Sequence, residues 1–306
     1  MCGIVGFLAK TQELQQSLGA HVTPMLDCMG TRGPDSAGFA VFTEPVAADC
    51  RRFSVFAYER SFDWQTFQNA FREHVSATAN GNGGGDFEFE AIANHGAVVS
   101  SIDPGCFKDW LNREYLQLHL LSVGHAIDLY KDEGHPHEIG ERFGFANLTG
   151  THAIAHTRMA TESAVSPAHA HPFTAGEDFC LVHNGSLSNP YSIRRKLERL
   201  GITFETDNDT EAGCRDLEWR LREGDTLEQA IESSFSELDG FFTFLMATAD
   251  KMVLVRDAFA CKPAVAAETD DYVAVASEFR SLAHLPDINQ ANVFEPMPEQ
   301  IYSWTV

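Results

Sequence analysis

The sequence predicts an α+β fold, because helical and strand patterns alternate along the chain and many of the strands are short. An apolar strand at 4–8 is followed by a predicted helix at 13–29 and a second strand at 39–42. Near the C-terminus, apolar runs separated by turn residues predict antiparallel hairpins. These runs lie at 241–248, 252–256, 264–268 and 272–276.

The length and composition limit the classes of protein that this chain can be. With 306 residues it can form one large domain or a domain that carries an insertion. Its formal net charge of -22 disfavours binding to nucleic acid, because an acidic surface repels phosphate backbones. The sequence has no apolar run long enough to span a membrane and no secretion signal, so we expect a cytoplasmic protein.

The cysteines and histidines do not indicate a disulfide framework or a metal site. The seven cysteines are odd in number and include no C-x-x-C pair. The pairs His135/His137 and His169/His171 have the spacing of metal ligands, but no carboxylate or thiol stands at zinc-site spacing from them. We therefore predict that this chain itself binds no metal and no cofactor.

Hydrophobic periodicity divides the chain into three zones, 1–44, 45–150 and 151–306. The middle zone combines alternating strands, one of them near 123–130, with two amphipathic helices. It is predicted to be a small α+β insertion within one larger domain. Aromatic stripes on the two helices are interpreted as core rather than as a cofactor site. The stripes contain Trp64, Phe67, Phe71 and Val75 on one helix and Trp110, Leu111, Tyr115 and Leu118 on the other.

Cys2 is the candidate nucleophile. A small residue after the initiator Met1 normally permits removal of the methionine, which leaves Cys2 with a free α-amine. An unperturbed α-amine has a pKa of about 8 and a thiol a pKa of about 8.5, so the amine can accept the thiol proton near neutral pH. A nucleophile and its base on one residue are an established arrangement for acyl transfer. Taken alone, the segment 1–4 is equally compatible with a buried cysteine on a strand.

Six short motifs, in order, resemble those of the class II glutamine amidotransferases. They lie in the first and third zones, which make up about two thirds of the chain. The resemblance implies a four-layer αββα sandwich of the N-terminal nucleophile hydrolase type and hydrolysis of the glutamine side-chain amide through a Cys2 thioester. The motifs are Met1-Cys2-Gly3-Ile4, Arg32-Gly33-Pro34-Asp35-Ser36-Ala37-Gly38, His156-Thr157-Arg158-Met159-Ala160-Thr161, Ala170-His171-Pro172, His183-Asn184-Gly185 and Asp209-Thr210-Glu211.

Asn184 and Gly185 are the candidate oxyanion donors. Acyl transfer from an amide needs hydrogen-bond donors where the carbonyl oxygen becomes negative, and an Asn side chain with a Gly backbone N–H can supply them. Loss of one such donor typically costs about a hundredfold to a thousandfold in rate. An Asn-Gly pair by itself is also a common hairpin turn.

Arg158 and Asp209 are the candidate groups for recognition of free glutamine. Arg offers a planar fork for the α-carboxylate and Asp complements the α-ammonium, as the resemblance implies for both positions. By the same resemblance Thr161 and His171 line the pocket, although His171 can equally be a structural histidine. Arg32 and Asp35 are the last two candidate site residues. They are expected to order the turn beside the site without acting directly in catalysis.

The chain contains no recognisable domain that could consume ammonia, so we expect a partner to do so. Three further features resemble the glutaminase-like subunits of split glutamate-synthase-type enzymes, including the glutaminase-like component of N-methylglutamate synthase. They are the long insertion, the segment His-Thr-Arg-Met-Ala-Thr-Glu-Ser at 156–163, and the C-terminal run from Arg256-Asp257-Ala258 through Cys261-Lys262-Pro263-Ala264-Val265 to Ala276-Ser277-Glu278. That resemblance implies an FMN-dependent synthase-like partner, with FMN and an Fe–S cluster in partner subunits only. Two alternatives stay open: hydrolysis of another γ-glutamyl amide such as γ-glutamylmethylamide, and a non-catalytic role in assembly.

Overall fold

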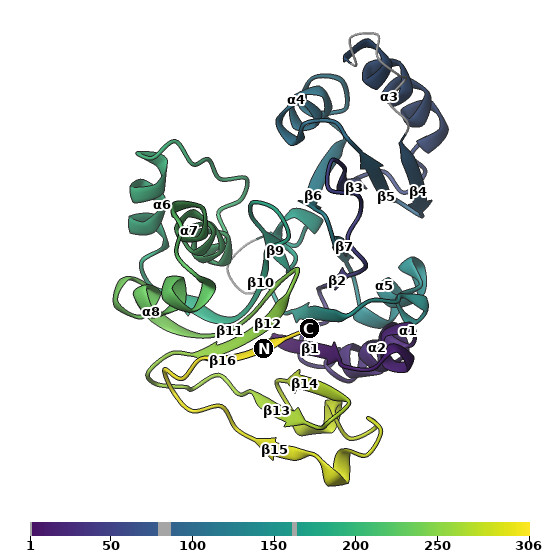
Figure 1. Cartoon of the computed structure of the whole chain (residues 1–306). Coiled ribbons are helices and arrows are strands. Elements are labelled where there is room, and N and C mark those ends of the chain that lie inside the picture. The colour runs from purple at the N-terminus through teal and green to yellow at the C-terminus, as the bar shows by residue number, and fades with distance from the viewer. Residues whose placement is uncertain (1, 79–86, 161–163) are drawn as a thin grey trace.

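Two β-sheets packed face to face form the centre of the structure, and helices cover their outer faces (Figure 1). The computed structural model describes residues 2–78, 87–160 and 164–306. Its mixture of helices and short strands agrees with the predicted α+β class.

The first sheet has seven strands in the order β15-β13-β14-β1-β8-β2-β7, and all neighbouring strands are antiparallel. Strand β1 is buried along its whole length because it is covered on both faces. Val5 and Phe7 pack against helices, whereas Ile4 and Leu8 pack against the second sheet. The strands are β1 (Gly3–Ala9), β2 (Ser36–Phe42), β7 (Ile127–Glu133), β8 (His152–Arg158), β13 (Val265–Glu268), β14 (Tyr272–Ala276) and β15 (Asn292–Phe294).

The second sheet has five strands in the order β16-β12-β11-β10-β9. The predicted C-terminal hairpins are confirmed, and they fall in different sheets: β11 pairs with β12 in the second sheet, and β13 with β14 in the first. The strands of the second sheet are β9 (Phe173–Thr174), β10 (Cys180–Leu187), β11 (Gly240–Thr248), β12 (Lys251–Arg256) and β16 (Tyr302–Thr305).

Helices lie on the outer face of each sheet. Those on the first sheet are α1 (Gln12–Gln16), α2 (Leu18–Cys28) and α5 (Pro136–Phe143); those on the second are α6 (Pro190–Glu198), α7 (Asp209–Glu223) and α8 (Leu227–Glu237). Short 3-10 helices are η1 (Phe145–Asn147), η2 (Pro167–His169), η3 (Phe279–Ser281) and η4 (Ile288–Gln290). In the part of the chain that the structure describes, no helix combines the length and apolarity needed to cross a membrane.

The predicted single helix at 13–29 is wrong, because it is interrupted at Ser17, where α1 ends and α2 begins. The cause is a close approach by the chain that follows α5. The Gly19 N–H donates to the Leu148 carbonyl at 2.9 Å, and a Cβ at position 19 would lie 2.0 Å from the carbonyl oxygen of Phe145. Glycine is therefore needed at this contact.

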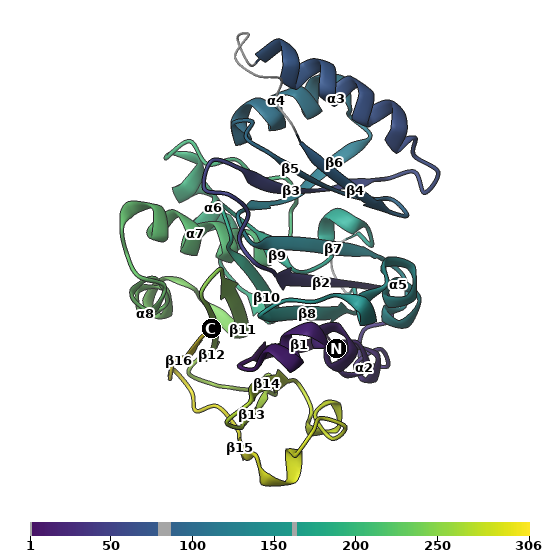
Figure 2. The ribbon, with the colours of Figure 1, turned by 45° about the vertical axis from the view of Figure 1, so that its right-hand side comes forward.

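A third, four-stranded sheet forms the insertion, with two helices packed on it (Figure 2). The aromatic stripes of these helices are confirmed as core, although Leu118 belongs to a strand and not to the second helix. The sheet has the order β4-β5-β3-β6. Its elements are β3 (Arg51–Ala57), α3 (Trp64–Thr78), β4 (Glu88–Ile92), β5 (His95–Ser100), α4 (Pro104–Glu114) and β6 (Leu118–Gly124).

The insertion ends earlier than the predicted boundary at 150, because β7 pairs with β2 of the first sheet and α5 packs beside it. The predicted strand at 123–130 is in fact the end of β6 and the beginning of β7. One carboxylate, that of Asp178, fixes the turn between them. It accepts the backbone N–H groups of His125 at 2.8 Å, Ala126 at 2.9 Å and Ile127 at 3.0 Å.

Two buried histidines of β8 connect the two central sheets. His152 Nε2 lies 2.8 Å from the Thr248 carbonyl of β11, and His156 Nε2 lies 3.0 Å from the His183 carbonyl of β10. Burial lowers the pKa of His152 to about 4 and that of His156 to about 3, although the bonds to the two carbonyls act in the opposite direction. Both imidazoles are therefore neutral in the folded protein near neutral pH.

We expect the free energy of unfolding to fall as the pH is lowered from about 7 to about 5. Below pH 6.5, the ordinary histidine pKa, His152 and His156 bind protons in the unfolded chain but stay unprotonated in the folded protein. Each then costs about 1.4 kcal/mol of stability per pH unit until its folded-state pKa is reached. Urea unfolding across this range measures the slope. His152→Gln should make the slope shallower by about 1.4 kcal/mol per pH unit, and an unchanged slope would contradict the assignment.

Candidate active site

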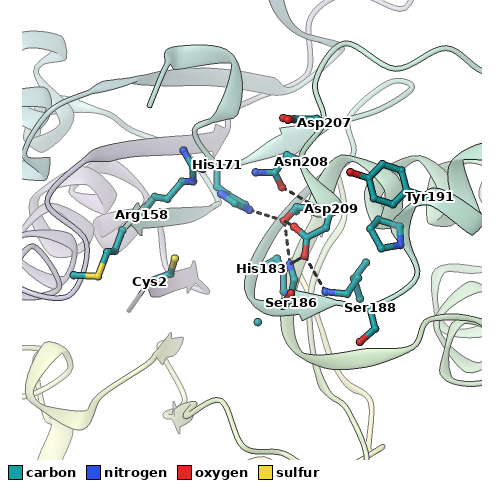
Figure 3. Close-up of a pocket in the computed structure, with 15 residues that line it drawn as sticks. Cys2, Arg158, His171, His183, Ser186, Ser188, Tyr191, Asp207, Asn208 and Asp209 are labelled. Carbon is teal, nitrogen blue, oxygen red and sulfur yellow. Dashed lines mark hydrogen bonds and ion pairs between the residues drawn. The ribbon is translucent and has the colours of Figure 1, made fainter. Parts of the chain in front are cut away.

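A cavity of about 350 Å³ opens between the ends of β1 and β8 on one side and the start of α7 on the other (Figure 3). Its volume suits a small polar ligand. Five of the residues predicted from the sequence line it: Cys2, Arg158, His171, Gly185 and Asp209. The other lining residues are Met159, His183, Ser186, Leu187, Ser188, Pro190, Tyr191, Asp207, Asn208 and Thr210.

Cys2 is half-buried and directly precedes β1, and its backbone is held by hydrogen bonds from two segments. Its carbonyl oxygen accepts a hydrogen bond from Arg32 Nε at 3.1 Å and another from Asn184 Nδ2 at 3.3 Å. The first bond comes from the turn before β2 and the second from β10 of the other sheet. Two distant segments therefore fix the position of the thiol-bearing residue.

Arg32 is in turn held by Glu278, which the sequence did not single out as a site residue. Arg32 Nη1 forms an ion pair with Glu278 Oε1, and Arg280 Nε lies 2.6 Å from Glu278 Oε2. Ser277, the preceding residue, accepts the Ile4 N–H at 2.9 Å. The segment after β14 thus supports the start of β1 directly and through Arg32.

Asn184 and Gly185 lie inside strand β10, where Asn184 is opposite Thr243 and Gly185 is opposite Phe242. They do not form a hairpin turn, so that alternative is excluded. Gly185 has a φ of 155°, and a Cβ there would lie 2.1 Å from the Phe241 carbonyl oxygen. Only glycine can occupy this position without displacing the neighbouring strand. The position brings the backbone of β10 to the cavity wall beside Cys2.

Arg158 ends β8 and is only 5% exposed. Its Nη1 donates to the Ala164 carbonyl at 3.0 Å. Burial lowers the pKa of Arg158 from its ordinary value, and negative charge at Cys2 and Asp35 acts in the opposite direction. A guanidinium stays protonated at neutral pH even so, because its ordinary pKa is above about 12. The cavity therefore has a fixed cation on the Cys2 side.

Asp35 fixes the backbone that directly follows the Arg158 side chain. Its N–H donates to the Arg158 carbonyl at 3.1 Å, and its Oδ2 accepts the Ala160 N–H at 2.8 Å. This contact gives Asp35 a positioning role. Thr161, predicted to line the pocket, lies outside the residues that the structure describes.

Asp209 is the first residue of α7 and faces the cavity from the side opposite Arg158 (Figure 3). Its Oδ2 accepts the Leu187 N–H at 2.8 Å. The N-cap Asn208 accepts the Thr210 N–H at 2.9 Å, which orders the first turn. An anion at a helix N-terminus is favoured by the helix dipole. The cavity therefore has a fixed anion facing the cation.

His171 lines the cavity, but its ring nitrogen is turned toward Thr210. Nε2 lies 2.9 Å from Thr210 Oγ1, and the ring centroid lies 4.1 Å from that of His156. Burial lowers the pKa of His171 well below its ordinary value, so the ring is neutral. Lys131 Nζ donates to the carbonyls of Ala170 at 3.0 Å and Pro172 at 3.2 Å, which holds the segment around His171.

Sequence reasoning missed four residues that shape this site: His183, Thr210, Glu278 and Lys131. His183 and Thr210 stand inside quoted motifs, next to Asn184 and Asp209, and that adjacency was an available signal. Glu278 ends the C-terminal run that carries the resemblance to the glutaminase-like subunits, but no role was predicted for it, and Lys131 lies in a segment with no local pattern that indicates a role. In the described part of the chain, no group of three or more His, Cys, Asp or Glu side chains could hold a metal ion.

Comparison with known proteins identifies the family. The chain is 39% identical over 308 residues to the glutamine amidotransferase-like protein GlxB of Rhizobium meliloti (strain 1021), covering 99% of this chain and 98% of that protein. It is 33% identical over 310 residues to a protein of Methanothermobacter thermautotrophicus provisionally named a glutamine amidotransferase, covering 99% of each. The chain belongs to the class II glutamine amidotransferases. A family model described as a glutamine amidotransferase domain matches residues 156–284.

As a glutamine amidotransferase, the chain is an enzyme whose family substrate is glutamine. The family-model match contains Arg158, His171, Asn184 and Asp209. The fold also resembles that of glutamine phosphoribosylpyrophosphate amidotransferase from B. subtilis, with a TM-score of 0.60 and 18% identity. That comparison covers 99% of this amidotransferase chain but 49% of the solved one, so the chain spans about half the length of that enzyme.

Proposed function

We propose that this amidotransferase hydrolyses the side-chain amide of glutamine through a γ-glutamyl thioester on Cys2. The observation that supports this most strongly is the shared cavity of Cys2, Arg158 and Asp209, which has a nucleophile and a fixed cation on one side and a fixed anion on the other. Free glutamine carries an α-carboxylate and an α-ammonium at one end and the reactive amide at the other. Arg158 pairs with the carboxylate and Asp209 with the ammonium.

In the proposed reaction the α-amine of Cys2, freed by removal of Met1, accepts the thiol proton. The sulfur attacks the amide carbon and forms a tetrahedral intermediate. The C–N bond then breaks, and ammonia leaves with the proton that the amine returns. Water attacks the thioester, with the amine again accepting a proton, and glutamate is released as the C–S bond breaks and the thiol is restored.

Asn184 and Gly185 are the proposed oxyanion donors. An Asn amide group has two N–H donors, and in Asn184 one of them is used by the Cys2 carbonyl. We propose that the second binds the oxygen of the substrate amide together with the backbone N–H of Gly185, which lines the cavity as Asn184 itself does not. This arrangement couples the position of Cys2 to that of its oxyanion donor through one side chain.

We assign the fold to the four-layer αββα class of N-terminal nucleophile hydrolases. The assignment is supported by three separate apolar clusters: one between helices and the first sheet, one between the two sheets, and one between the second sheet and its helices. The residue directly before β1 is then the nucleophile.

The ammonia is proposed to pass to a partner subunit that resembles an FMN-dependent glutamate synthase, as in N-methylglutamate synthase. The four-stranded insertion supports this proposal, because its sheet and helices form a separate core that does not contribute to the cavity. In this proposal FMN and any Fe–S cluster belong to the partner. Hydrolysis of γ-glutamylmethylamide is the alternative substrate assignment.

The purified protein is expected to release glutamate and ammonia from glutamine in equal amounts, faster than methylamine from γ-glutamylmethylamide. Glutamate and ammonia are measured enzymatically, and intact mass checks that the active protein lacks Met1. A chain that keeps Met1 at full activity would contradict the role of the α-amine. Faster turnover of the methylamide would instead favour the alternative substrate, and no turnover of either would contradict hydrolysis.

A further inference from the structure

We propose that the Thr210 hydroxyl positions the Asp209 carboxylate for the α-ammonium of glutamine, and that His171 and His183 hold this hydroxyl in place. This inference rests on the proposed function and adds a specificity device to it. It also gives His171 a positioning role in addition to its place in the cavity wall. Thr210 and His183 are not part of the predicted site.

Three polar groups converge on the Thr210 hydroxyl oxygen. His171 Nε2 lies 2.9 Å away, His183 Nδ1 lies 3.0 Å away, and Asp209 Oδ1 accepts from Thr210 at 3.3 Å. Thr210 is 1% exposed, so water does not compete for these bonds. Figure 3 shows the two imidazoles pointing toward the start of α7 from different directions.

The number of protons determines how these bonds are arranged. A hydroxyl has one proton to donate and two lone pairs to accept with. An ionised carboxylate only accepts, so the single Thr210 proton goes to Asp209. The two imidazoles must then both donate to the Thr210 oxygen, His171 from Nε2 and His183 from Nδ1. His183 Nδ1 is also 4.0 Å from Asp209 Oδ2, where an N–H is favourable and a bare lone pair is not.

Burial keeps both imidazoles in the neutral form that this arrangement requires. Burial lowers the pKa of His183, although the Asp209 carboxylate acts in the opposite direction, and it lowers the pKa of His171 well below the ordinary value. Each ring then has one N–H. That of His171 points from Nε2 to Thr210. In His183 the Phe241 carbonyl competes with Thr210 for the single N–H, and the Asp209 carboxylate beside Nδ1 favours the proton on Nδ1, toward Thr210. The His156 bond to the His183 carbonyl and the Lys131 bonds to residues 170 and 172 hold the backbones that carry the two rings.

The result is a carboxylate whose two oxygens are both fixed from within the protein. Oδ1 accepts from Thr210 and Oδ2 from the Leu187 N–H at 2.8 Å. The Asp209 side chain is still 27% exposed, so it can meet a ligand in the cavity. A fixed carboxylate binds an ammonium without first losing side-chain freedom. Thr210 therefore contributes to the selection of substrates that carry an α-ammonium.

The test compares glutamine with glutaramate, which has the same amide and carboxylate but no α-ammonium. In Thr210→Val the ratio of kcat/KM for glutamine to that for glutaramate should fall about tenfold, the usual effect of one hydrogen bond to a charged group. Most of the change should appear in KM for glutamine. Thr210→Ser, which keeps the hydroxyl, should restore the ratio. Thr210→Ala provides the same comparison if the valine variant does not fold.

Thr66 offers a matched control, because its hydroxyl also donates to an aspartate, Asp63 Oδ2 at 2.6 Å, but lies in the insertion and outside the cavity. Thr66→Val should leave the ratio unchanged. Two results would overturn this inference and leave the proposed function standing, provided that the wild-type protein hydrolyses glutamine. Thr210→Val would lower kcat/KM equally for glutamine and glutaramate, or it would lower neither. A wild-type protein that does not hydrolyse glutamine would overturn both.

Discussion

Cys2→Ala is expected to reduce glutamine hydrolysis by at least about ten-thousandfold, because the residue supplies the only atom that bonds covalently to the substrate in the proposed reaction. The fold should be retained, since the Cys2 contacts with Arg32 and Asn184 use its backbone carbonyl and not its thiol. Initial rates of ammonia release measure the loss. Circular dichroism and the urea midpoint check the fold.

Cys28 is the matched control for this substitution. It is also half-buried but lies in α2, outside the cavity. Cys28→Ala should retain the wild-type rate. A diazo-ketone analogue of glutamine should label Cys2 alone among the seven cysteines. Peptide mapping that finds the label on Cys28 or Cys180, or substantial activity in Cys2→Ala, would refute the assignment of the nucleophile.

The sequence predicted those site residues that short motifs specify. Cys2, Arg158, Gly185 and Asp209 stand in four separate motifs, and the fold brings them to one cavity. Each has a chemistry that can be inferred from the residue type alone: a thiol, a guanidinium, a backbone without Cβ and a carboxylate. Only the family resemblance indicated that the four residues share one site, because separation along the sequence does not predict how far apart residues lie in the folded protein.

Other features could not be predicted, because they depend on contacts between remote segments. Glu278 meets Arg32 across 246 positions of sequence, and Asp178 fixes the turn at 125–127 from more than 50 positions away. The same limit explains the insertion boundary and the interruption at Ser17. Nothing local distinguishes the β7 strand from those of the insertion, and a backbone carbonyl more than a hundred residues away decides where α1 ends.

Lys131 shows the same limit at a single residue. A lysine in a strand is normally read as an exposed side chain, yet Lys131 is 4% exposed and donates to two carbonyls beside His171. Burial lowers its pKa to about 8. The fold makes this possible by placing η2 and β9 over the end of β7. Neither the residue type nor the hydrophobic periodicity predicts where η2 and β9 pack.

Arg158→Gln is expected to raise KM for glutamine about a hundredfold with a smaller effect on kcat. In the proposed binding mode the substitution removes a bidentate, charge-assisted contact with the α-carboxylate, which is worth about 3 kcal/mol or more. It acts on the end of the substrate that does not react. Arg158→Lys should fall between wild type and Arg158→Gln, because lysine keeps the charge but loses the fork. Steady-state kinetics with glutamine measure these values.

Two truncated substrates then separate the roles of Arg158 and Asp209. 4-Aminobutanamide lacks the α-carboxylate of glutamine, and glutaramate lacks the α-ammonium. Arg158→Gln should lose the preference for glutamine over 4-aminobutanamide and keep its preference over glutaramate, while Asp209→Asn should show the reverse. This crossed result is expected because the two charges lie on opposite sides of the cavity, so each variant loses contact with one end group only. If the preferences change the other way round, both assignments are contradicted, because neither a guanidinium nor a carboxylate attracts a group of its own charge. If both variants lose both preferences equally, the two residues maintain the shape of the cavity and do not each recognise one group.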